Sequence, residues 1–265
     1  MQNTIHLWRW ILTVLLGLNV TALADLCIAA PVEIRFPEGV SKGFLVLRDK
    51  DGALLAEGEV SQAATGGGRV VNRMLFRFKD GSVHDESVTF SQNRILKLLQ
   101  YQLEQKGPAF PQPVKVTLNG ETGAYTVREG PSSKAELKGR IDLPSDVYNG
   151  LTITVLKNLP SPSERVFHLV AFDPEATVYK MVVSPVGTDE VEAAGTTMRA
   201  VHYKMKPVLG WWMKTLAWIT NKTIPEYDFW VTNDSLPAFV RFEGALYDEG
   251  PSWLILQAVP KLAKE

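Results

Sequence analysis

The sequence has little of several things that would point to a particular chemistry. Cysteine occurs once in 265 residues, at Cys27, so an intrachain disulfide is excluded. Net charge is almost absent, because 28 basic and 29 acidic residues leave a balance of -1, and no global field attracts nucleic acid or an anionic membrane. The aromatic residues are spread out without interleaved basic ones, which disfavours a nucleic-acid surface.

Catalytic and metal-binding motifs are also lacking. No serine lies in a Gly-x-Ser-x-Gly or Ser-x-x-Lys pattern. The glycine run Thr65–Arg69 is not followed by the Gly-Lys-Ser/Thr of a phosphate-binding loop, so it indicates a flexible hairpin loop. His84, His168 and His202 have no histidine or cysteine two or four residues away to form a ligand pair. We therefore expect no catalytic residue, no metal site and no cofactor.

The N-terminus is typical of an export signal, which we assign to residues 1–24. Arg9 ends a weakly positive start, Ile11–Val20 is an apolar run, and small residues precede a cleavage site after Ala24. Cleavage after Ala30 is the alternative. An uncleaved membrane anchor is the competing interpretation, although the apolar run is short for a span of about 20 residues. The protein is expected to be periplasmic or secreted.

Cys27 follows the apolar run, where a lipidated cysteine would stand. Lipoprotein signals carry a small residue directly before the cysteine, and here that position holds Leu26, after the charged Asp25. This departure disfavours a lipid anchor at Cys27.

Turn dipeptides divide the remaining chain at short intervals. Asp-Gly and Asn-Gly pairs supply the positive φ angles that tight hairpins need. They are Asp51-Gly52, Asp80-Gly81, Asn119-Gly120 and Asn149-Gly150, and Glu129-Gly130 is a further turn dipeptide. They predict an antiparallel meander.

Short alternating or continuous apolar runs lie between these turns and predict strands. The runs are 43–47, 70–78, 83–90, 95–103, 114–118, 166–172, 176–184, 198–206, 229–232, 238–247 and 252–259, with a turn at 185–187. We predict a mainly β fold, a curved antiparallel meander of half-barrel or sandwich-like form with one or two short helices packed on its concave face. Residues 31–265 are expected to form a single β-rich domain, and two halves divided near 131–135 are the alternative.

A change of period predicts a short helix before Leu159. Ser145 or Asp146 would cap it, and a strand over 151–156 is the competing interpretation. The apolar residues that would share one helical face are Val147, Tyr148, Leu151, Val155 and Leu159.

The segment Tyr203–Lys222 has the most unusual composition, since it holds three of the seven tryptophans and four lysines without an acid. On a helix it would present a broad apolar arc and a narrow polar strip. We predict ligand contacts from its apolar side chains, which are Leu209, Trp211, Trp212, Leu216, Trp218 and Ile219. Its lysines are the candidates for a membrane surface and are Lys204, Lys206, Lys214 and Lys222.

Three stretches resemble an uncharacterised family of exported bacterial proteins that is known only as a domain of unknown function. They are Gln105–Pro111, Leu143–Leu151 and Pro237–Tyr247. This resemblance implies a bacterial periplasmic protein and no particular activity. The expected architecture is also similar, more loosely, to the half-barrels of LolA- and LolB-type lipoprotein carriers, which hold acyl chains in a concave sheet.

The leading hypothesis is an exported, non-enzymatic protein that binds an apolar or lipid ligand under the Trp-rich segment. The Trp-rich segment could instead simply fill the core, which needs no ligand, and this interpretation is an alternative to ligand binding. One alternative places the segment at a membrane surface. Another is a hydrolase of cell-envelope polymers that uses acids such as Glu243 and Asp146, which requires two carboxyls held about 5 to 10 Å apart in a cleft.

Overall fold

The computed structural model describes residues 31–130, 136–173, 175–208 and 225–258. In this part of the chain there are fourteen strands and one α-helix, α2 (Thr152–Asn158). The strands are β1 (Ser41–Arg48), β2 (Leu54–Gly66), β3 (Arg69–Phe78), β4 (Val83–Ser91), β5 (Lys97–Lys106), β6 (Val114–Asn119), β7 (Ala124–Glu129), β8 (Leu137–Arg140), β9 (Arg165–Asp173), β10 (Glu175–Ala193), β11 (Thr196–Pro207), β12 (Tyr227–Thr232), β13 (Phe239–Gly244) and β14 (Trp253–Ala258).

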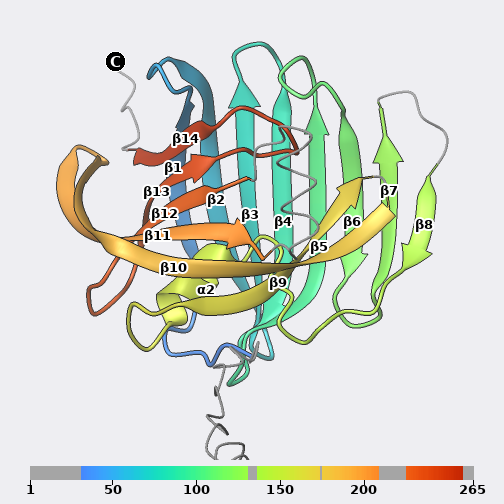
Figure 1. The fold of residues 1–265 in the computed structure, drawn as a ribbon, viewed down its shortest axis with the longest axis horizontal. Coiled ribbons are helices and arrows are strands. Elements are labelled where there is room, and N and C mark those ends of the chain that lie inside the picture. Colours follow the sequence, from blue (N-terminus) through green and yellow to red (C-terminus); the bar gives the residue numbers. More distant parts are fainter. Residues whose placement is uncertain (1–30, 131–135, 174, 209–224, 259–265) are drawn as a thin grey trace, which may run out of the picture.

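The strands form one sheet in which every pair of neighbours is antiparallel. Its order is β8-β7-β6-β5-β4-β3-β2-β1-β14-β13-β12-β11-β10-β9, so two consecutive meanders meet where β1 pairs with β14. The sheet curves around, with β8 and β9 as its two edges (Figure 1). The predicted mainly β, curved antiparallel meander of half-barrel form is confirmed.

Alternation along the strands separates an inner face from an outer face. In β4, Val88 and Phe90 are buried on the inner face, whereas Asp85 and Ser87 alternate with them and lie on the outer face. Helix α2 packs on the inner face, because Val155 belongs to the same apolar cluster as Val88 and Phe90. The prediction of a short helix on the concave face is therefore confirmed for α2.

Two apolar clusters fill the inner face. The larger one joins β3–β7 and β9–β12 to α2 and includes Phe90, Tyr148 and Phe167, which are fully buried. The smaller one lies over β1–β3 and β14, where the rings of Phe78, Phe110 and Trp253 pack edge to face or tilted, with centroids 5.4 to 5.9 Å apart. Burying aromatic rings of this size contributes much of the stability of such a core.

Several local predictions are confirmed and others are wrong. The β3–β4 hairpin turns at Asp80-Gly81, where Gly81 has a φ of 88°. The predicted turn at 185–187 is wrong: Pro185 lies within β10, and a bulge between Pro185 and Gly187 shifts the register with β11. A bulge tolerates proline because the residue need not donate to the ladder at that point.

The helix is confirmed over the competing strand, but its predicted caps are wrong. The N-cap is Leu151, which makes no side-chain capping bond. Asp146 instead accepts from His168, and Val147 forms a bridge to β9, so the segment before α2 is held by the sheet rather than by the helix. Strand β2 was not among the predicted runs.

Candidate functional site

One row of side chains crosses the inner face between the two apolar clusters. Direct cross-strand partners place Val60 beside Met74, Met74 beside Glu86, and Glu86 beside Leu103, from β2 to β5. We call these four residues the inner row. All four are only partly buried, although the neighbouring rows hold the fully buried Phe76 on one side and the buried Val88 on the other. The inner row is therefore an incompletely covered apolar strip that carries one carboxyl group.

The Glu86 carboxyl is held by Tyr101. The Tyr101 hydroxyl donates a hydrogen bond of 2.9 Å to Glu86 Oε1. Gly150, at a φ of 68°, brings the loop before α2 against this pair, since a Cβ atom there would lie 3.5 Å from Glu86 Cδ and from Tyr101 Cε2. A larger residue would be strained there and would crowd the pair.

Burial shapes the protonation of this pair. Glu86 keeps part of its surface exposed, yet enough protein surrounds it that burial raises the pKa of its carboxyl, while the bond from Tyr101 acts in the opposite direction. Burial and the neighbouring Glu86 also raise the pKa of the Tyr101 hydroxyl well above its usual range. The raised pKa of Glu86 brings it nearer to the neutral acid form, which can donate as well as accept.

His84 lies two residues away on the same face and is fully enclosed. The side-chain amide of Gln105 approaches His84 Nδ1 at 3.0 Å and donates to the Leu246 carbonyl at 2.8 Å. His84 Nε2 is buried without a hydrogen-bond partner, and its ring neighbours are Phe76 and Phe110. Burial lowers the pKa of the imidazole to about 4, so His84 is neutral near pH 7.

Two hollows lie away from the inner row. A cavity of about 180 Å³ lies at the C-terminal end of α2, where Lys157 and Arg35 contribute to its lining. Both cations are engaged within the protein, because Lys157 Nζ lies 2.6 Å from Glu38 Oε1 and Arg35 Nη1 donates to the Leu159 carbonyl. Both cations of the lining are therefore already engaged, and Asp234 is its remaining charged residue.

The second hollow is an open groove of about 600 Å³ along β1–β3. Phe44, Glu57 and Arg77 line it, and strand alternation places these side chains on the outer face. Neither hollow is lined by a residue of the inner row.

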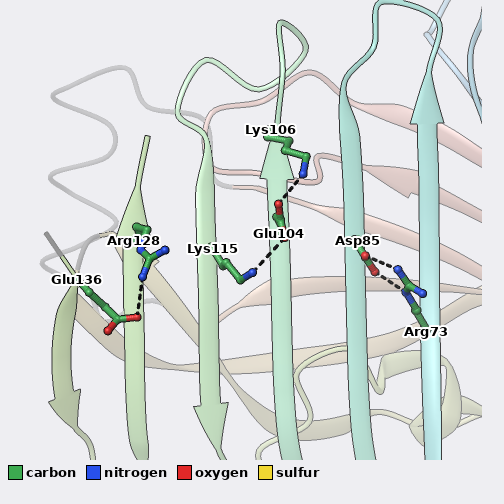
Figure 2. Close-up of polar contacts among 7 residues, drawn as sticks. All are labelled: Arg73, Asp85, Glu104, Lys106, Lys115, Arg128 and Glu136. Atoms are coloured by element: carbon green, nitrogen blue, oxygen red, sulfur yellow. Dashed lines mark hydrogen bonds and ion pairs between the residues drawn. The ribbon is translucent and has the colours of Figure 1, made fainter. Parts of the chain in front are cut away.

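Ion pairs cover the outer face of β3–β8. Arg73 forms a two-pronged pair with Asp85, with Nε–Oδ1 at 2.8 Å and Nη2–Oδ2 at 2.6 Å. Glu104 lies between Lys106 and Lys115, as Figure 2 shows, with Nζ–Oε distances of 2.7 and 3.4 Å. Neighbouring charges hold the pKa values of the Asp85 and Glu104 carboxyls below their usual range. A mixed, paired surface of this kind is typical of a solvent-exposed face.

All six residues predicted to contact a ligand, and two of the four lysines predicted for a membrane surface, lie outside the described residues. These are Leu209, Trp211, Trp212, Leu216, Trp218 and Ile219, together with Lys214 and Lys222. The signal sequence, both cleavage sites, Cys27 and the division near 131–135 also lie outside the described part of the chain. Lys204 is within it and pairs with Glu226 at 2.9 Å, while Lys206 is exposed on β11.

The two acids named for a hydrolase stand in different surroundings. Asp146 is buried and its Oδ1 lies 2.9 Å from His168 Nδ1, on edge strand β9. Glu243 pairs with Arg241 at 2.7 Å on β13, which is four strands from β9 in the sheet. Each acid therefore has its own cationic or imidazole partner, and neither lines the two hollows.

The three histidines are distributed over β4, β9 and β11. Among the described residues, no group of three or more His, Cys, Asp or Glu side chains is placed to hold a metal ion. Within the same residues, no helix has the length and apolar character needed to cross a membrane.

Sequence reasoning missed the inner row, although a signal for it was present. The predicted β3–β4 hairpin pairs Met74 with Glu86, and alternation puts Glu86 on the same face as Val88 and Phe90. An acid on the apolar face of a predicted strand was therefore visible. Its partner Tyr101 depends on the β4–β5 register, which is broken by a bulge at Thr89 and Phe90.

Comparisons with known proteins find a distant likeness among solved structures. No protein-family model matches the chain, and no curated protein matches it. Among solved structures, the chain is similar to a β-barrel-like protein of the domain of unknown function DUF1849 from Brucella abortus, with a TM-score of 0.46 and 10% identity over 88% of this chain and 100% of that chain. That protein, like the family that the sequence resembles, is described without a function.

Proposed function

We propose that this is an exported, non-enzymatic protein that binds an apolar or lipid ligand on the inner face of its half-barrel. The observation that supports this most directly is the inner row, in which Val60, Met74 and Leu103 remain partly exposed on the face that elsewhere forms the core. Covering such side chains is favourable by about 1.5 to 3 kcal/mol for each one that becomes fully buried. A ligand that lies along the row would gain part of this free energy.

The single polar group in the row sets the chemistry of the ligand. Glu86 lies between Met74 and Leu103, and one of its oxygens accepts from Tyr101. An amphiphile would place its acyl or other apolar part along Val60, Met74 and Leu103 and its polar group at Glu86. The Trp-rich segment, with Trp211, Trp212 and Trp218, is proposed to cover the ligand from the open side.

Binding of a fluorescent fatty-acid probe tests this assignment. Met74 and Val71 lie on the same strand and are both partly buried, but Met74 faces inward and Val71 outward. We expect Met74→Gln to weaken probe binding by about tenfold or more, since a polar amide would replace apolar contact area. Val71→Gln should bind like the wild type. Equal affinity of both variants, or no probe binding to the wild type, would overturn the proposal.

Export is tested separately from binding. N-terminal sequencing of the protein recovered from the periplasm or medium should begin at Asp25, or at Pro31 if cleavage follows Ala30. Recovery of the full-length chain from the membrane fraction would instead support an uncleaved anchor.

A further inference from the structure

The hairpin of β10 and β11 is longer than its neighbours, and the half of it nearest the turn folds back on the sheet. β10 has 19 residues and β11 has 12, whereas β12, β13 and β14 each have six. The bulge at Pro185 and Gly187 divides the hairpin into two parts. We call residues 187–202, which include the turn, the distal half. The distal half curls toward β14 at the left of Figure 1, and the Ala194 amide donates to the Gln257 carbonyl at 3.2 Å.

The distal half covers a small apolar cluster that is separate from the two inner ones. Val191 and Ala193 of β10 pack there with Trp230 of β12 and Val240 of β13. Trp230 alternates with Phe229 and Val231, which face inward, so this cluster lies on the outer face. With only five buried residues it is small, and polar contacts around Trp230 complete the attachment.

Trp230 is flanked on the neighbouring strands by its cross-strand partners His202 and Arg241. The His202 ring stacks on its indole with centroids 4.2 Å apart and planes 13° apart. Arg241 Cζ, from the other neighbouring strand, lies 4.5 Å from the indole centroid. The indole N–H donates to Asp189 Oδ2 at 2.8 Å, which ties Trp230 to the distal half. A cation over an indole face is attracted by the ring's negative potential.

Both nitrogens of His202 face carboxylates. Nε2 lies 2.7 Å from Asp228 Oδ1 on β12, and Nδ1 lies 3.5 Å from Asp189 Oδ2 on the distal half. A neutral imidazole has a single N–H, so one of its nitrogens would turn a lone pair toward a carboxylate. The imidazolium form instead donates to Asp228 and places a positive charge beside Asp189 and against the Trp230 ring. The contacts therefore suit the protonated ring.

From these contacts we propose that His202 is a pH-sensitive clasp that holds the distal half of the β10–β11 hairpin on the outer face of β12 and β13. In the imidazolium form it links Asp189 to Asp228 across β11. When the proton leaves to solvent, the contact between His202 and Asp189 loses its charge assistance. The distal half, which begins at the Pro185–Gly187 bulge, then detaches from the outer face of β12 and β13.

The other charged groups near the clasp are few and mostly paired. Lys204 lies 3.9 Å from Asp228 Oδ1 and 2.9 Å from Glu226. Arg241 is bound to Glu243, which is the cross-strand partner of Asp228. Within this set, His202 is the one histidine, and histidine is the side-chain type whose charge ordinarily changes between pH 5 and 8.

Hydrogen exchange of the mature protein tests the clasp. After correction for intrinsic exchange, we expect amide protection within residues 188–200 to fall by about tenfold or more between pH 5.5 and 8.5. Protection of the β2–β3 hairpin, measured in the same samples, should stay unchanged. Equal protection of residues 188–200 at both pH values would overturn the proposal.

Variants separate the clasp from general destabilisation. Asp189→Asn keeps an acceptor for the Trp230 N–H but removes the charge next to His202, so it should reduce the pH dependence while the cluster stays packed. His168→Gln changes a histidine that pairs with Asp146 instead, and it should retain the wild-type response. A wild-type response in Asp189→Asn, or loss of the response in His168→Gln, would contradict the assignment to His202. If either variant fails to fold, titration of the His202 ring by NMR in the wild type, followed together with protection, decides the same question.

Discussion

Substitution of His84 gives the sharpest test of the enclosed inner face. Burial lowers the pKa of its imidazole from 6.5 to about 4. Below pH 6.5 the His84 imidazole is protonated in the unfolded chain but stays neutral in the folded chain. The free energy of unfolding therefore falls as the pH falls from 6.5 toward 4. Above pH 6.5 the group is neutral in both states and contributes no pH dependence.

The size of the effect follows from the two pKa values. With 6.5 for the unfolded state and about 4 for the folded state, His84 lowers the free energy of unfolding by about 2 kcal/mol at pH 5 and about 3 kcal/mol at pH 4, relative to pH 7.5. His84→Gln keeps an acceptor for the Gln105 amide and removes the titrating ring. The variant should therefore lack this part of the acid destabilisation.

Urea unfolding followed by tryptophan fluorescence at pH 7.5, 5 and 4 measures the difference. Other carboxylates lose stability in acid as well, but they do so in both proteins, so subtracting the variant from the wild type isolates His84. The loss between pH 7.5 and 4 should be about 3 kcal/mol larger in the wild type. Parallel pH dependences within about 0.5 kcal/mol would refute the enclosure of a neutral His84.

Three further predictions concern the same sheet. Glu86→Gln should stabilise the protein at neutral pH and have little effect in acid, because a carboxyl with a raised pKa binds more protons when folded and loses stability as the pH rises. Gly58→Ala should cost about 1 to 3 kcal/mol, because its new methyl group would overlap the Phe76 ring and lie 2.9 Å from the Leu75 carbonyl oxygen. Arg73→Ala, which breaks the exposed pair with Asp85, should cost less than about 1 kcal/mol and less still in 1 M salt.

Matched variants control these measurements, all made by urea unfolding. Glu57→Gln changes an acid on the outer face and should not reproduce the pH dependence of Glu86→Gln. Gly39→Ala meets no atom within 4 Å and should be nearly neutral. An equal stabilising effect of Glu86→Gln at pH 4 and 7 would contradict the raised pKa of Glu86. A neutral Gly58→Ala would contradict the close approach of Phe76. A loss above about 2 kcal/mol for Arg73→Ala would contradict an exposed, weak pair with Asp85.

Local patterns predicted the strands better than the contacts between them. Alternation in 70–78 and 83–90 and the Asp80-Gly81 turn specify the β3–β4 hairpin almost completely. The pairing of β1 with β14 joins segments more than 200 residues apart, and no local period encodes it. The missed β2 shows the same limit, since Ala56 and Gly58 are small where rings from β3 cover them, so its apolar face is supplied by the neighbouring strand.

The candidate site was hidden for a similar reason. Asp146 looked like a helix cap in the sequence, but a tertiary contact with His168 outweighed its local preference. Glu86 could be placed on an apolar face from alternation, whereas its bond to Tyr101 required the bulged β4–β5 register. The aromatic composition of 203–222 pointed instead to ligand contacts in that segment, and those contacts remain a prediction.

The central claim is that the inner row binds an apolar or lipid ligand, and analysis of co-purified ligand tests it most directly. The mature protein would be purified without detergent, examined by native mass spectrometry, and extracted for lipid analysis, in parallel with Met74→Gln and Val71→Gln. The account predicts a bound lipid in the wild type and in Val71→Gln and its loss in Met74→Gln. A ligand-free mass for the wild type, or equal lipid in all three proteins, would contradict it.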